Sequence, residues 1–92
     1  MEFEWGDKKA ASNLADHGVS FDEAKTVFDD PLYMDFYDPD HSYGEHRFII
    51  VGQSRQRRLL MVSYTERGNA IRLISARELT PAERRKYERG QH

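Results

Sequence analysis

The stretch Leu59–Glu88, LLMVSYTERGNAIRLISARELTPAERRKYE, decides the fold. Two strand-like runs, Leu59–Thr65 and Ala70–Ala76, flank a Glu-Arg-Gly-Asn turn and predict a β-hairpin. A helix follows, because Thr80 suits the N-cap, Pro81 suits the first helical position and Glu83 completes a capping box. We expect this helix to end near Gly90.

Arginine supplies most of the positive charge in and just after this stretch. The residues concerned are Arg67, Arg72, Arg77, Arg84, Arg85 and Arg89. A guanidinium is a planar fork that binds phosphate or carboxylate through two parallel hydrogen bonds, whereas a lysine ammonium is a compact point charge. The hairpin and its helix therefore indicate an anion-binding or RNA-cutting sheet.

Two short helices are predicted in the first third of the chain. The first spans Asp7 to His17, with Gly18 in the left-handed position after its end. Its apolar stripe, which we expect to face the sheet, consists of Ala10, Ala11, Leu14 and Ala15. The second begins at a capping box, Ser20-Phe21-Asp22-Glu23, and ends before Pro31, because the residue before a proline disfavours helical geometry. Its buried residues are expected to be Phe21, Ala24, Val27 and Phe28.

A short strand opens the chain, and two longer ones precede the hairpin. The opening strand covers Phe3–Trp5, with Phe3 and Trp5 on one side. The next, Leu32–Tyr37, is separated by a polar loop from His46–Gly52, whose two faces both carry bulky side chains. We expect an α+β fold of order β-α-α-β-β-β-β-α. Its central antiparallel sheet has about four strands, and two N-terminal helices and one C-terminal helix lie mainly on one side.

Length and composition favour one small soluble domain. The chain has 92 residues, of which 38% are hydrophobic, so we expect a single domain over residues 1–92. No apolar run reaches the length of a membrane span, and the first residues are acidic where a secretory signal is basic, so we expect a cytoplasmic protein with no membrane contact. Cysteine is absent, which excludes disulfides, thiolate metal sites and a cysteine nucleophile.

The net charge of −2 hides an uneven distribution. Residues 1–46 carry three Lys or Arg against twelve Asp or Glu, and residues 47–92 carry eleven against four. One interpretation is a basic surface that holds phosphates, with an acidic flank that faces a basic partner. The alternative is that the two halves interleave in space and cancel, and the sequence alone does not distinguish the two.

RNA cleavage without a metal ion needs a base for the 2′-hydroxyl, an acid for the leaving 5′-oxygen, and cations around the phosphorane. Glu45 and His46, at the mouth of a predicted strand, and His17, at a helix end, are the acid–base candidates. The candidate cations are Arg47, Arg67, Arg72 and Arg77. The candidate RNA-binding residues are Tyr64 and Tyr87, which could stack a base or donate to phosphate, and Arg84 and Arg85, which could track the backbone.

Each candidate has a structural alternative. His17 beside Gly18 also suits a helix C-terminal cap, where the helix dipole favours its positive form. Glu45 and Arg47, two residues apart on one strand, also suit a surface ion pair. The basic residues of the last helix also suit a solvated face, with Tyr87 packed on the sheet.

Two spacings restrict the site. Arg72 and Arg77 have opposite parity, so an unbroken strand would put them on opposite faces, and they can share a site only if the strand ends or bulges between them. The second spacing is that of four acidic residues, Asp29, Asp30, Asp38 and Asp40. It matches no calcium-binding loop, so we expect neither a metal ion nor a cofactor.

The sequence resembles the BrnT toxins over nearly the whole chain. The first half carries Phe3-Glu4-Trp5, Lys9, Asn13, His17-Gly18-Val19-Ser20-Phe21, Glu23-Ala24 and Val27-Phe28-Asp29-Asp30-Pro31. The second half carries Glu45-His46-Arg47-Phe48, Gly52, Thr65-Glu66-Arg67, the specific run Ile71-Arg72-Leu73-Ile74-Ser75-Ala76-Arg77, Glu83 and Tyr87. One departure is Trp5-Gly6-Asp7, where the family usually has Trp-Asp.

The resemblance implies a RelE-like ribonuclease fold and a toxin that halts translation by cutting RNA. It also implies a BrnA antitoxin, a ribbon-helix-helix DNA-binding protein that neutralises the toxin and represses the operon with it. Operator DNA would then be bound only through the toxin–antitoxin complex. By position, the resemblance assigns the site to Glu45, Arg47, Arg72 and Arg77, with His17 and Arg67 as further members.

Three functions compete. The first is a metal-independent endoribonuclease toxin, which the resemblance favours over the others. The second is a non-catalytic module whose arginines grip an acidic partner segment or a nucleic-acid backbone. The third is a stand-alone DNA-binding repressor, which is disfavoured because the two early helices carry negative charge where DNA phosphates would lie.

Overall fold

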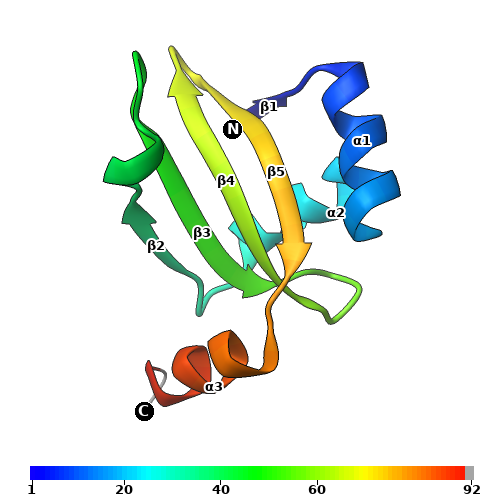
Figure 1. Ribbon diagram of the computed structural model, residues 1–92, viewed down its shortest axis with the longest axis vertical. Helices are drawn as coiled ribbons and strands as arrows, with labels where there is room; N and C mark the ends of the chain where they lie inside the picture. The colour runs from blue at the N-terminus through cyan, green and yellow to red at the C-terminus, as the bar shows by residue number, and fades with distance from the viewer. Residues whose placement is uncertain (91–92) are drawn as a thin grey trace.

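The computed structural model describes residues 1–90 and contains a five-stranded sheet of order β1-β5-β4-β3-β2 (Figure 1). The strands are β1 (Glu2–Glu4), β2 (Met34–Tyr37), β3 (Arg47–Gln53), β4 (Leu59–Arg67) and β5 (Ala70–Glu78). The helices are α1 (Asp7–His17), α2 (Phe21–Ala24) with its 3-10 continuation η1 (Lys25–Asp29), the 3-10 turn η2 (Pro39–His41), and α3 (Pro81–Gly90). None of these helices has the length and apolarity needed to cross a bilayer.

The α+β class and the central hairpin are confirmed, whereas the expected sheet of about four antiparallel strands is wrong in detail. The sheet has five strands and is mixed, because β1 pairs in parallel with β5, with Phe3 opposite Ile71. The other neighbours are antiparallel. Sequence patterns predict hairpins because the two strands of a hairpin are neighbours in the chain. The pairing of β1 with β5 joins segments almost seventy residues apart, so no pattern within either segment predicts it.

One face of the sheet carries the main core. Phe21, Ala24 and Val27 are buried against it, as expected, and the alternate residues of the central strands lie beneath them. These strand residues are Ile50, Leu60, Val62, Tyr64, Ile71, Leu73 and Ala76. Gly52 allows η1 to approach closely, since a Cβ there would lie 3.1 Å from a methyl group of Val27.

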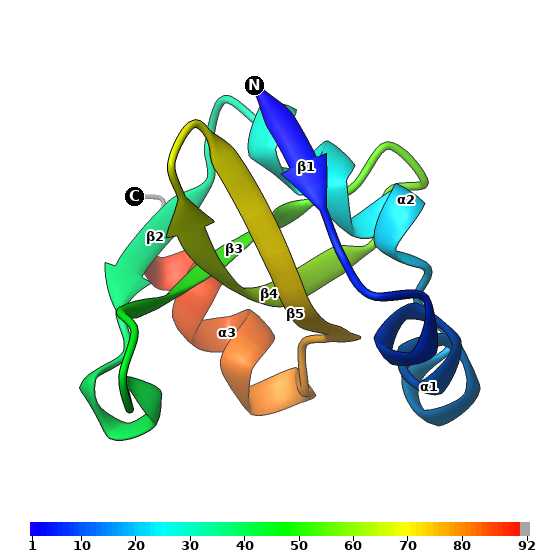
Figure 2. The same ribbon diagram turned by 90° about the horizontal axis from the view of Figure 1, so that it is seen from above.

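The C-terminal helix packs on the opposite face, which corrects the prediction that the helices lie mainly on one side. Figure 2 shows α2 and α3 on opposite sides of the sheet. The parity of the strands agrees, because α2 and η1 cover Ile50 and Val62, whereas Val51 and Met61 line a groove with α3. The hairpin fixes where α3 begins, but only the packing of the whole sheet decides which face it covers.

The α1 helix has the predicted bounds, and Gly18 ends it with a φ of 67° and an N–H bond of 2.9 Å to Leu14 O. The predicted apolar stripe is right only for Ala10, which packs against the core, because Leu14 is 53% exposed and Asn13 is buried instead. The Asn13 amide donates to Ala76 O at 2.8 Å and accepts from Ala76 N at 2.9 Å. The Asn13 side chain therefore satisfies the backbone groups of Ala76 as a neighbouring strand would, because β1 pairs only with residues 70–72 of β5.

The two predicted capping boxes differ in outcome. At α3 the box is complete, with Thr80 N bonded to Glu83 Oε1 and Glu83 N bonded to Thr80 Oγ. At α2, Ser20 Oγ accepts from Glu23 N at 3.0 Å, but the Glu23 carboxylate turns inward. There it accepts from Arg58 Nε at 2.9 Å and from the Ser54 hydroxyl at 2.7 Å, which fastens the β3–β4 loop to α2. The hydrogen bond from Arg58 is the main reason that the pKa of Glu23 is lowered.

Replacing Asn13 tests its role at the sheet edge. Asn13→Ala leaves the buried N–H and C=O of Ala76 without partners, so we expect the free energy of unfolding to fall by about 3 kcal/mol. Leu14→Ala, on the exposed side of the same helix, should change it by less than about 0.5 kcal/mol. Urea denaturation of both variants measures the difference, and equal stabilities would contradict the edge role.

Candidate active site

The face of the sheet that is turned away from α1 and α2 is covered by α3 at one end only (Figure 1). The rest of this face, which we call the open face, brings together arginines from separate strands. Tyr64 and Leu73 point into the core, so their neighbours Thr65 and Arg72 point outward. Arg47 of β3 lies opposite Thr65, and Thr65 lies opposite Arg72 of β5. We call Arg47, Thr65 and Arg72 the arginine row. The strands that carry its two arginines, β3 and β5, are about 10 Å apart, which is two strand spacings.

A bulge in β5 places Arg77 on the same face. Ser63 lies opposite Ser75, whereas Tyr64 lies opposite Leu73, so Ile74 is an extra residue. The bulge shifts the alternation of side chains along β5 by one residue. Arg72 and Arg77, which would lie on opposite faces of a regular strand, therefore lie on the same face. Arg77 lies opposite Met61, four residues along β4 from Thr65, which puts it about 13 Å from the arginine row.

A carboxylate lies at the end of the arginine row. Glu45 Oε1 is 4.0 Å from Arg47 Nε, and Glu45 Oε2 is 3.5 Å from a terminal nitrogen of Arg67. Arg47 Nε is buried and has no hydrogen-bond partner within residues 1–90. Glu45, Arg47 and Arg67 thus form one cluster, in which the ion pair predicted for Glu45 and Arg47 is present at the edge of bonding distance.

The other two arginines are also held by carboxylates. Arg72 donates to Glu4 at 2.8 Å, across the pairing of β5 with β1. Arg77 donates through two nitrogens to Glu83 of α3, at 2.7 and 2.9 Å. This bidentate bond, helped by the Thr80 backbone N–H, lowers the pKa of Glu83 from 4.5 to about 2 and raises that of Arg77.

Three predicted residues, His17, Tyr64 and His46, lie away from this face. His17 is exposed at the C-terminal end of α1, and α1 packs beside Ala76 rather than beside the arginine row. Tyr64 is 6% exposed and belongs to the core, where it stacks on Phe48. Burial is the main reason that the pKa of Tyr64 is raised to about 12. Tyr64 therefore has no free ring face for a base.

The predicted residues of the last helix lie beside the open face. Arg84 and Arg85 are exposed on α3. Tyr87 is half-buried, lines the groove between α3 and the sheet, and donates its hydroxyl to Leu32 O at 3.1 Å. His46 turns to the other side of β3, where its Nδ1 lies 3.2 Å from the Tyr37 hydroxyl.

Three contributors to the site were not predicted as such. Thr65 is 2% exposed, sits between the two arginines of the row and donates to His46 O at 2.6 Å. Glu4 and Glu83 are the carboxylates that hold Arg72 and Arg77. The alternation of β4 could have singled out Thr65, because Thr65 is a small polar residue on the side of the strand that faces away from the core. The carboxylate partners of Arg72 and Arg77 could not be predicted in this way, because they depend on contacts between separate elements.

The arrangement suits the recognition of a phosphodiester. Guanidinium groups from two strands flank a small side chain, and a carboxylate stands within reach of one of them. Within residues 1–90, no group of three or more His, Asp and Glu side chains is arranged to hold a metal ion.

The fold and the arginine row define a small α+β protein whose open sheet face presents guanidinium groups. The sequence profile described as the ribonuclease toxin BrnT of type II toxin-antitoxin systems matches residues 5–83. The chain therefore belongs to the BrnT family of ribonuclease toxins.

The fold is similar to that of a BrnT protein already solved. The 1.1 Å crystal structure of the ribonuclease toxin BrnT from Brucella abortus matches with a TM-score of 0.65 and 20% sequence identity, over 87% of this chain and 97% of that one. A comparison with curated proteins gave no match. The structural likeness supports the fold, and the family assignment stands on the sequence profile.

The ion pair between Glu83 and Arg77 predicts a specific pH dependence of stability. The pKa of Glu83 is lowered on folding, so its contribution is complete above pH 4.5 and is lost as the pH falls toward 2. Glu83→Gln should therefore be less stable than the wild type at pH 6, by an amount that shrinks between pH 4.5 and 2. Urea midpoints across this range measure the effect. Glu88→Gln on the same helix is the control, and a difference for Glu83→Gln that does not change with pH would contradict the assignment.

Proposed function

We propose that this protein is a metal-independent endoribonuclease toxin that cuts RNA on the open face of its sheet. The observation that carries the proposal is the arginine row, with Glu45 4.0 Å from Arg47. A phosphodiester bound over Thr65 would lie between the guanidinium groups of Arg47 and Arg72, which donate parallel hydrogen bonds to phosphate oxygens.

In the proposed reaction the ribose 2′-oxygen attacks the adjacent phosphorus, and the bond from phosphorus to the 5′-oxygen breaks. Glu45 accepts the proton of the 2′-hydroxyl, and Arg47 and Arg72 balance the negative charge that grows on the phosphorane oxygens. Arg67, 3.5 Å from Glu45, orients that carboxylate. The departing 5′-oxygen takes up a proton from water, so the products are a 2′,3′-cyclic phosphate and a 5′-hydroxyl end.

Arginines outside the row extend the proposed RNA-binding surface. Arg77 lies about 13 Å from the row and would contact a second phosphate, in competition with Glu83. Arg84 and Arg85, exposed on α3, would attract the RNA backbone through long-range charge. Three predicted residues are left out of the proposed site: His17 ends α1, Tyr64 lies in the core, and His46 turns to the opposite side of β3.

The family also implies an antitoxin partner, since a type II toxin is neutralised by a protein. We infer that this partner is a ribbon-helix-helix protein of the BrnA kind, and that operator DNA is bound only through the complex. In this proposal the toxin acts in the cytoplasm as one domain of residues 1–92 and stops translation by cutting RNA in a RelE-like manner.

Cleavage of RNA in the presence of EDTA tests the proposed chemistry. Arg72→Ala removes a cation that balances transition-state charge, and Glu45→Gln removes the base, so each should slow cleavage about 100-fold or more. The rate is measured on purified protein with a labelled RNA, with and without ribosomes, and the 2′,3′-cyclic phosphate end is identified on the product.

Arg55→Ala is the matched control, because Arg55 is an exposed arginine that pairs with Asp29 on the opposite side of β3 from the arginine row. Its rate should stay within about twofold of the wild type. If the wild type leaves RNA intact in both assays, or if Arg72→Ala cuts as fast as Arg55→Ala, the proposed chemistry is wrong. Salt-dependent RNA binding without cleavage would favour a non-catalytic module instead.

A further inference from the structure

The exposed apolar side chains of this protein are concentrated in one segment. Within residues 1–90, the large exposed hydrophobic residues outside it are Met1 and Leu14. Those inside it are Leu32, Tyr33, Met34, Phe36, Tyr37 and Tyr43. A cluster of this kind on one edge of a small protein marks an interaction surface, whereas scattered exposed residues are ordinary.

The backbone of β2 is also open to pairing. It is an edge strand, and within residues 1–90 no other strand pairs with its outer side (Figure 1). Asp38 N donates to Arg47 O, and bonds in an antiparallel ladder alternate, so the N–H and C=O groups of Asp35 and Tyr37 point away from β3. Edge strands of soluble proteins are usually protected by charge or by a covering element, whereas β2 carries one charged residue, Asp35, and all four of its residues are exposed within residues 1–90.

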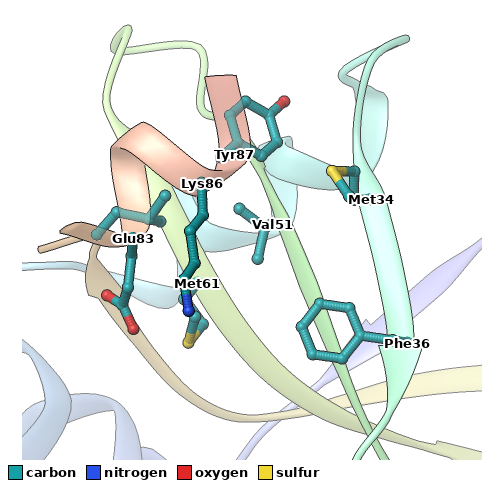
Figure 3. A pocket seen from close by; sticks show the side chains of 8 residues that line it. Met34, Phe36, Val51, Met61, Glu83, Lys86 and Tyr87 are labelled. Carbon is teal, nitrogen blue, oxygen red and sulfur yellow. The ribbon is translucent and has the colours of Figure 1, made fainter. Parts of the chain in front are cut away.

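An apolar groove continues from this edge beneath α3. It has a volume of about 300 Å³, and its floor is formed by Met34 and Phe36 of β2 with Val51 and Met61 of the central strands (Figure 3). Tyr87, Lys86 and Glu83 line it from α3. Side chains on one face of a strand added to β2 would therefore reach an apolar cavity.

The charge of the segment decides between the possible occupants. Residues 26–46 contain no Lys or Arg, and three carboxylates, Asp35, Asp38 and Asp40, lie in β2 or just after it. This negative charge repels an RNA backbone, and it repels the same segment of a second copy. It favours an extended segment that carries both apolar side chains and Lys or Arg.

We propose that β2 is the docking edge for the antitoxin, an inference that rests on the antitoxin partner of the proposed function. The antitoxin adds a strand of about four residues between the limits set by Pro31 and Pro39. Its alternate apolar side chains enter the groove beneath α3. Its Lys or Arg residues face Asp35 and Asp40.

The test uses the full-length toxin and the purified cognate antitoxin encoded in the same operon. Phe36→Lys and Asp40→Lys place positive charge on the docking edge, so each should raise the dissociation constant about tenfold or more. Leu14→Lys, at an exposed apolar residue on α1, is the control and should bind as the wild type does. All three variants should still cut RNA at the wild-type rate, but the antitoxin should no longer suppress cleavage by Phe36→Lys and Asp40→Lys.

Amide hydrogen exchange of the unmodified toxin provides a measurement that needs no variant. The amides of Asp35 and Tyr37 should exchange rapidly in the free protein and at least about tenfold more slowly in the complex, because strand addition gives them hydrogen-bond acceptors. Amides of α1 should not change. The dissociation constants and the hydrogen-exchange rates depend on antitoxin binding alone, so both remain decisive if the toxin proves to have no ribonuclease activity.

Four results would overturn the docking edge. The first is wild-type affinity in both Phe36→Lys and Asp40→Lys, with no new protection of the Asp35 and Tyr37 amides from exchange. The second is loss of RNA cleavage in Phe36→Lys, which would make the groove an RNA-binding surface. The third is a toxin homodimer that Phe36→Lys dissociates. The fourth is the absence of any complex with the wild-type toxin, which would overturn the partner assignment as well.

Discussion

The single extra residue in β5 is the constraint on which the candidate site depends. Leu73 and Ala76 must both reach the core, and they have opposite parity, so the strand can bury both only by bulging at Ile74. The same bulge turns Arg77 to the face that already carries Arg72. Burial of apolar side chains on one side of the sheet thus places two cations on the other side.

Carboxylates hold the cations of this face in the free protein. Arg72 pairs with Glu4, Arg77 with Glu83, and both Arg47 and Arg67 approach Glu45. The pairs of Arg47, Arg67 and Arg72 contribute at most about 1 kcal/mol each, so a phosphate can displace their carboxylates at small cost, whereas the bidentate pair of Arg77 with Glu83 is stronger. Most of these pairs join the acidic half of the chain to the basic half, which therefore interleave over the sheet, while the segment around β2 keeps its negative charge.

The structure separates two surfaces that use the same sheet. The arginine row lies across β3, β4 and β5, and the apolar groove lies between β2 and α3. Arg77 and Glu83 stand between them, because Glu83 lines the groove and also holds the arginine. An antitoxin seated along β2 would therefore lie beside the proposed RNA-binding face.

The sequence by itself determined the elements whose signals are local: the hairpin, the bounds of α1, the burial of Phe21 and Val27, and the capping box at Thr80. It also singled out Arg47, Arg72 and Arg77 by residue type. Only the tertiary structure decided that β1 joins β5, that α3 covers the face opposite α1, that Asn13 rather than Leu14 is buried, and that Tyr64 belongs to the core. Periodicity reports which side of its own element a residue occupies, whereas pairing partners, bulges and covered faces depend on contacts between segments far apart in the chain.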